Sequence, residues 1–287
     1  MKDKKLNAAL AIQRREITEY HVYTALAQIC KDAHNAEVLR TIAEEEKLHA
    51  KFWQERTGIE VKPSRFTVFQ TVLRARILGL TFTLKQMEKV EKSISVSTRE
   101  LVGDFIGADN IISEEADHEN KLINMLDEER LRYAGSVVLG LNDALVELTG
   151  SLAGFTLALG NTRLISLAGL VTGVSASFSM AASEFLSCRA ENDPRAMKSA
   201  LYTGIAYVIT VTLLIIPFLL LPEKFIALGI TLSVAVLIIL VFNYYLATAR
   251  DLDFKSRFFE MTVISLGVAL LSFGIGFILN KVLGVDV

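Results

Sequence analysis

Long apolar stretches fill the second half of the chain, whereas the first half mixes apolar and charged residues at short intervals. A helix needs about 20 residues to cross a hydrocarbon core of about 30 Å, since each residue adds about 1.5 Å. Every one of these stretches reaches that length, and the segments after the second, third and fourth contain proline or several charges. The pattern therefore predicts five membrane-spanning helices, over residues 133–160, 164–188, 199–221, 225–249 and 258–280.

The first half predicts four helices, because its apolar residues recur at helical spacing. The first two form an antiparallel hairpin around the polar turn KDAHN, and Gly58 ends the second. A capping box, Ser97-x-x-Glu100, starts the fourth. The four helices are expected over residues 5–31, 35–57, about 66–95 and about 97–132. The predicted fold class is all-α, with a four-helix bundle over residues 1–131 and a five-helix transmembrane domain over residues 132–287.

Composition supports this division and narrows the function. Residues 1–132 hold 43 of the 62 charged side chains and all four histidines. The formal net charge of -2 offers no clustered basic surface of the kind that phosphate contacts need, so nucleic-acid binding is excluded. Cys30 and Cys188 form neither a disulfide framework nor a Cys-x-x-Cys motif, which favours free thiols in a reducing compartment. The N-terminus lacks the apolar core of a signal peptide.

Lysines and arginines predict the orientation in the membrane, because cytoplasmic loops retain them. Eight flank the first span or follow the second and fourth spans, and three lie in the opposite loops and the C-terminal tail. The bias predicts a multi-pass membrane protein whose N-terminal domain is cytoplasmic and whose C-terminus lies on the other side.

Three acidic residues and a methionine stand out within the first two predicted spans. Asp143 lies about 15 Å into the first span, and Met180 lies about 12 Å from the inner end of the second. Glu147 follows Asp143 by one turn, and Glu184 lies nearer the cytoplasm. Glu184 and Met180 also fit a side chain that extends to the interface and an apolar core residue. A carboxylate in the middle of the membrane, however, costs about 2.5–3.5 kcal/mol even on the scale from membrane-insertion experiments, which gives the lowest values.

Carboxylate and thioether ligands together suit a borderline divalent ion such as Fe²⁺ or Mn²⁺, since sulfur disfavours Ca²⁺ and Mg²⁺. We therefore expect Asp143, Glu147, Met180 and Glu184 to line a metal transport path.

The first half contains two Glu-x-x-His pairs, Glu46 with His49 and Glu115 with His118. Residues three apart share a helix face, so each pair projects two metal-ligating groups in one direction. A single pair of this kind is usually a solvated face. Two pairs on the second and fourth helices, with glutamates from the first and third, are the ligand set of a di-iron carboxylate bundle.

The glutamates of the first and third helices complete this set. Residue 31, midway between Glu16 and Glu46, falls inside the hairpin turn, so the two glutamates are expected at one height. The third helix contributes less regularly, because the midpoints between its glutamates and the second pair fall about a turn beyond the predicted loop. The expected metal ligands are Glu16, Glu46, His49, Glu88, Glu91, Glu115 and His118, holding Fe²⁺ or Fe³⁺, with Mn²⁺ as an alternative.

GLNDALVELTGSLAG at residues 140–154 and GLVTGVSASFSMAASEFLS at 169–187 resemble the first two spans of the vacuolar iron transporter family. The resemblance implies a homodimer of five-span subunits that exchanges cytosolic Fe²⁺ for protons. It places Asp143 and Met180 in the translocation path and Glu184 near the cytoplasmic mouth.

Two departures from that family stand in this sequence. Ser183-Glu184-Phe185 replaces a Gly-Glu-Tyr run. Plant members carry a Glu-rich metal-binding segment between spans two and three, whereas only about ten residues, Arg189–Lys198, intervene in this chain.

The segments EEEKLH, MEKVE and EEADH, together with Glu16-x6-Tyr23, resemble the ferritin-like, rubrerythrin-type family across residues 5–130. No rubredoxin-like Cys-x-x-Cys pairs follow, which argues against an electron-fed peroxidase. The whole chain resembles the membrane-bound ferritins, a fusion group implicated in iron export. The sequence thus favours a transporter that expels Fe²⁺, with a bundle that senses, buffers or delivers iron.

Two other functions compete with iron export. One is a membrane-tethered ferroxidase or peroxide scavenger, with enzymatic activity in the ferritin-like domain. The other is a manganese transporter whose bundle gauges the metal.

Overall fold

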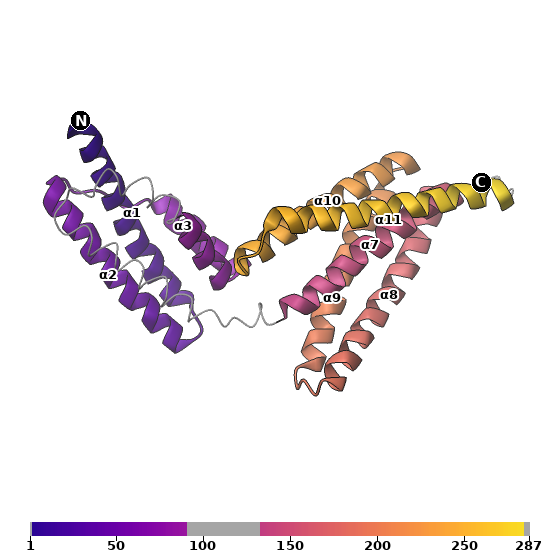
Figure 1. Ribbon diagram of the computed structural model, residues 1–287, viewed down its shortest axis with the longest axis horizontal. Coiled ribbons are helices and arrows are strands. Elements are labelled where there is room, and N and C mark those ends of the chain that lie inside the picture. The colour runs from indigo at the N-terminus through magenta and orange to yellow at the C-terminus, as the bar shows by residue number, and fades with distance from the viewer. Residues whose placement is uncertain (1, 91–132, 284–287) are drawn as a thin grey trace. The chain divides into compact units, whose positions relative to one another are not determined.

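The computed structural model describes residues 2–90 and 133–283. These residues form helices and no strand, which confirms the all-α fold class (Figure 1). The chain divides into two compact units, Met1–Glu128 and Glu129–Val287.

The first unit begins with the predicted hairpin, made of α1 (Lys2–Ile29) and α2 (Ala33–Thr57). Asp32 caps α2, since its carboxylate accepts a hydrogen bond of 2.8 Å from the backbone N–H of Asn35. Gly58 ends α2 in the left-handed conformation, with φ of 67°. Between the helices lies an apolar core that includes the fully buried Leu26 and Leu39. The hairpin brings residues equidistant from its turn to the same height.

The third helix differs from the prediction. The apolar spacing predicted one helix from about Phe66 to Ser95, but α3 (Arg65–Leu78) ends before Gly79, and a separate helix covers residues 80–90. Gly79 has φ of +99°, which L-residues with a Cβ rarely adopt. The remainder of the predicted third helix and the whole predicted fourth helix lie outside the described residues.

Within residues 133–283, the described part of the second unit, five helices are long and apolar enough to cross a membrane, as predicted. Each helix agrees with its predicted span to within four residues at either end. Polar side chains define two of the starts, since Asn161 caps the second helix and Glu223 the fourth. The helices are α7 (Ala134–Ala158), α8 (Thr162–Ala190), α9 (Ala196–Leu220), α10 (Lys224–Ala249) and α11 (Phe254–Leu283).

Helix α7 packs against α8, α9, α10 and α11. Small residues permit this close packing, because a Cβ on Gly140 would clash with the backbone oxygen of Thr203 in α9. On the α11 side, a Cβ on Gly276 would lie 2.7 Å from the backbone oxygen of Gly154. The buried side chains of Leu145, among others, fill the core around α7. The acidic residues of α7 thus lie on the helix that packs against all four of the others.

Candidate functional site

The hairpin of the first unit brings together three of the predicted metal ligands. Glu16 comes from α1, while Glu46 and His49 come from one face of α2. All three side chains are buried, with relative exposures of 0%, 1% and 3%. Each offers a ligand atom, and these atoms lie within 4.8 Å of one another. Charged side chains are almost never buried this fully without a compensating ion or partner, so the cluster needs a chemical explanation.

The distances within this cluster suit a metal ion. His49 Nδ1 lies 3.6 Å from Glu46 Oε2 and 3.9 Å from Glu16 Oε2, both too long for a hydrogen bond. Two ligand atoms each about 2.1 Å from one ion are separated by roughly 3.0–3.7 Å at ordinary coordination angles. The distance from His49 to Glu46 falls within that range, and the distance from His49 to Glu16 slightly exceeds it. The other oxygen of Glu16, Oε1, accepts a hydrogen bond of 3.0 Å from Arg15 Nη2. Arg15 thus orients the carboxylate and leaves Oε2 directed at the cluster.

The remaining predicted ligands of the bundle have different outcomes. Within the described residues, Glu88 lies outside the cluster of three. Its Oε2 forms an ion pair with Lys85 Nζ at 3.4 Å. Glu91, Glu115 and His118 lie outside the described residues. Glu16, Glu46 and His49 are thus the three of the seven predicted ligands that lie together in the described residues.

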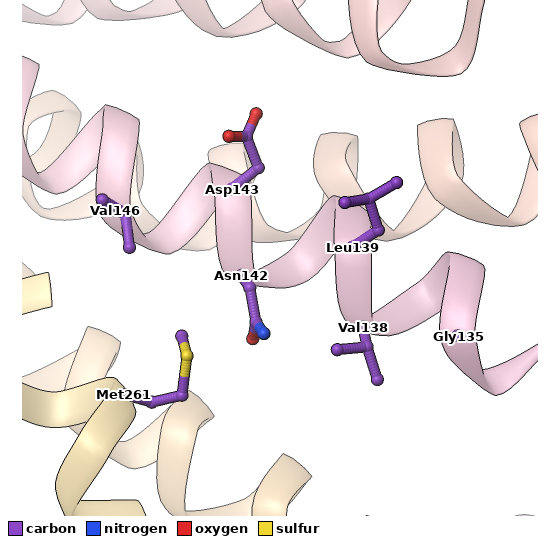
Figure 2. A pocket seen from close by; sticks show the side chains of 7 residues that line it. All are labelled: Gly135, Val138, Leu139, Asn142, Asp143, Val146 and Met261. Carbon is purple, nitrogen blue, oxygen red and sulfur yellow. The ribbon is translucent and has the colours of Figure 1, made fainter. Parts of the chain in front are cut away.

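In the membrane unit, Asp143 lines an open pocket of about 440 Å³ beside α7. Figure 2 shows Asn142, the preceding residue, pointing toward Met261 of α11, whereas the Asp143 carboxylate projects from another side of α7. The rest of the pocket lining is formed by Gly135, Val138, Leu139 and Val146. The lining of this pocket thus combines a carboxylate, an amide and a thioether with mainly apolar groups, and the carboxylate lies apart from the other two.

Hydrogen bonds from neighbouring helices hold the other two acidic residues. Tyr207 of α9, itself fully buried, donates from Oη to Glu147 Oε2 at 2.8 Å. Ser136 of α7 donates from Oγ to Glu184 Oε1 of α8 at 2.7 Å. The first bond ties Glu147 of α7 to α9, and the second ties Glu184 of α8 to α7. Met180, the predicted thioether ligand, packs partly buried against the apolar core.

The loop between α8 and α9 is short and held by an ion pair. Arg195 Nη2 lies 2.7 Å from Asp193 Oδ2, and this hydrogen-bonded contact lowers the pKa of Asp193 to about 2. Asn192 turns the chain with φ of 58°. A loop of this length has no room for a metal-binding domain between spans two and three.

Part of the membrane unit matches a known protein family. Residues 134–197 match the model of the VIT family. The matched range covers α7, α8 and the loop after α8, including all four residues of the predicted transport path. It supports the resemblance to vacuolar iron transporters and indicates a multi-pass membrane transporter of iron or manganese. No curated protein sequence matches the chain at a significant level.

Three residues of these sites were not predicted from the sequence. Arg15 directly precedes Glu16 in the sequence, so its positive charge could have indicated a partner for that carboxylate. Tyr207 sits in an otherwise apolar span, and a buried tyrosine usually needs a hydrogen-bond partner. Ser136 gave no such signal, because small hydroxyl residues are frequent in membrane helices.

Proposed function

We propose that the protein is a homodimer of five-span subunits that exports Fe²⁺, or Mn²⁺, from the cytoplasm in exchange for protons.

 The observation that carries the proposal is the pair of carboxylates, Asp143 and Glu147, one turn apart on a membrane helix inside the family-matched range. Carboxylate oxygens compensate the charge of a divalent cation, and a carboxylate that releases the ion can take up a proton in its place.

Exposure of these carboxylates supports the homodimer. Glu147 is exposed in the single subunit, and Asp143 is only half-buried, although both lie on a helix that crosses the membrane. A charge facing lipid is costly, so intramembrane acidic residues normally face a bundle interior or a water-filled cavity. A second subunit placed against this side of α7 would supply that surrounding and would bring two sets of carboxylates together.

The first unit is proposed to bind iron and to sense, buffer or deliver it. Glu16, Glu46 and His49 supply two carboxylates and an imidazole, which suit iron and manganese. In the proposed ferritin-like bundle, Glu88, Glu91, Glu115 and His118 complete a di-iron centre. Bound there, iron would provide a reservoir on the cytoplasmic side, and it would supply redox chemistry if the unit also oxidises Fe²⁺.

Transport in proteoliposomes tests the proposal. Asp143→Asn keeps the size of the side chain but removes its charge, so it should abolish Fe²⁺ and Mn²⁺ flux while metal binding to the first unit persists. Asp193→Asn is the matched control, because that carboxylate lies in the loop outside the spans, and its flux should equal that of the wild type. Wild-type flux through Asp143→Asn would overturn the assigned path and would favour the membrane-tethered oxidase.

A further inference from the structure

Helix α3 exposes an unusual apolar surface in the first unit. Phe66, Phe69 and Leu73 have relative exposures of 69%, 64% and 44%. At 3.6 residues per turn, these three side chains fall within about 60° of the helix circumference. They therefore form one continuous stripe, which we call the α3 stripe. The opposite side of the helix carries the buried residues Thr71 and Ala75, so α3 packs on the unit through its less apolar face.

Charge accompanies the α3 stripe on one side. The sequence of α3, RFTVFQTVLRARIL, contains three arginines and no aspartate or glutamate. Arg65 and Arg76 are exposed and lie within about 40° of Phe69 around the helix. Arginine beside an apolar stripe suits contact with a membrane surface, since the guanidinium groups attract anionic lipid headgroups.

A second copy of the chain fits this surface less well than lipid does. Each phenylalanine contributes on the order of 200 Å² when fully exposed, so the α3 stripe offers roughly 300 Å². A stable protein interface needs about 800 Å² per partner. A symmetric contact through the stripe would also bring the arginines of the two copies near one another.

The membrane-spanning part of the same chain keeps the first unit close to a bilayer. Five apolar helices anchor the second unit in the membrane, and the first unit is part of the same chain. Tethering raises the effective concentration of a surface near the bilayer, so a small apolar stripe is sufficient for stable contact. We propose that α3 is an interfacial helix, which inserts Phe66, Phe69 and Leu73 into an anionic bilayer surface with Arg65 and Arg76 at the headgroups.

Fluorescent labelling of the full-length protein in nanodiscs tests this proposal. A single cysteine is placed at Phe69 in a background with Cys30→Ser and Cys188→Ser, and it is labelled with an environment-sensitive dye. Leu48→Cys is the matched control, because Leu48 is 65% exposed on α2 but has the acidic Glu44 one turn away. The membranes contain phosphatidylcholine with or without phosphatidylglycerol, and a spin-labelled lipid serves as the quencher.

We expect a blue-shifted emission from position 69 and a loss of emission with the spin-labelled lipid, both larger with phosphatidylglycerol, and neither from position 48. The combined Arg65→Glu and Arg76→Glu substitutions should remove the dependence on phosphatidylglycerol. A blue shift without quenching by lipid would mean that protein covers the α3 stripe, and an unshifted emission would mean that water does; either result overturns the proposal. Labelling at Phe66→Cys repeats the test if the first variant unfolds.

Discussion

The cluster of Glu16, Glu46 and His49 makes a quantitative prediction about stability with and without metal. Glu46→Gln preserves the shape of the side chain but removes one of two carboxylate charges whose ligand atoms lie within 4.8 Å. At that separation and an effective dielectric constant of about 20, their repulsion is about 3.5 kcal/mol. Attraction to His49, when protonated, and to Arg15 offsets part of it. Glu46→Gln should therefore stabilise the metal-free first unit by about 1–2 kcal/mol.

Trp53 provides the assay. It is the only tryptophan of the chain, it is 3% exposed in the first unit, and it follows His49 by about one turn on α2. Its fluorescence in the full-length protein therefore reports the thermal unfolding of this unit. For a unit of this size, 1 kcal/mol changes the midpoint by about 3–6 °C. With a chelator present, the midpoint temperature of Glu46→Gln should therefore be about 3–12 °C higher than that of the wild type.

Added metal should reverse this order, so that the wild type has the higher unfolding midpoint. Bound metal stabilises the folded state of the wild type, whereas Glu46→Gln has lost a ligand and should gain little. Glu55→Gln is the control, since Glu55 is exposed on the same helix, and it should behave as wild type in both conditions. The reasoning fails if Fe²⁺ or Mn²⁺ raises the midpoint of Glu46→Gln as much as that of wild type, or if the chelated variant melts lower.

Three further predictions concern the membrane unit. Tyr207→Phe removes a hydrogen bond to a charged group, worth about 1.5–3 kcal/mol, and should lower metal flux at least about tenfold; unchanged flux would show that the Glu147 carboxylate needs no positioning. Gly140→Ala places a Cβ against the backbone of α9 and should destabilise the unit by about 1–3 kcal/mol in detergent unfolding, whereas Gly229→Ala, which meets nothing within 4 Å, should not. Single cysteines at Glu191 and Gly160, with Cys30 and Cys188 replaced, should be labelled from the cytoplasmic and the opposite side respectively; labelling of both from one side contradicts the predicted topology.

The sequence predicted the helices of the membrane unit well, because length and uninterrupted hydrophobicity are sufficient to define a span. It also anticipated that Glu16 and Glu46 would lie together, since the turn at residues 30–32 makes the two helices nearly symmetric about residue 31. Both inferences depend on distance along the chain, which the sequence contains directly.

Gly79 and Tyr207 show what the sequence could not supply. A glycine inside an apolar helical pattern is usually tolerated, so only the backbone angle of Gly79 reveals the interruption. Tyr207 needed a partner, but the identity of that partner depends on how α9 rotates against α7, which hydrophobicity does not determine. Residue types and spacing therefore predict candidates for a site, whereas contacts between helices identify their partners.

The contact between α7 and α11 has a consequence for how the protein is made. These helices are the first and last of the candidate spans in the described residues, yet Ser265 donates a hydrogen bond of 3.0 Å to the backbone oxygen of Leu145, and Gly276 meets Gly154 backbone to backbone. During synthesis, α7 therefore stays without this neighbour in the bilayer until the ribosome has also made α11. A truncation that removes α11 should therefore leave α7 without its neighbour and expose the nascent subunit to membrane quality control.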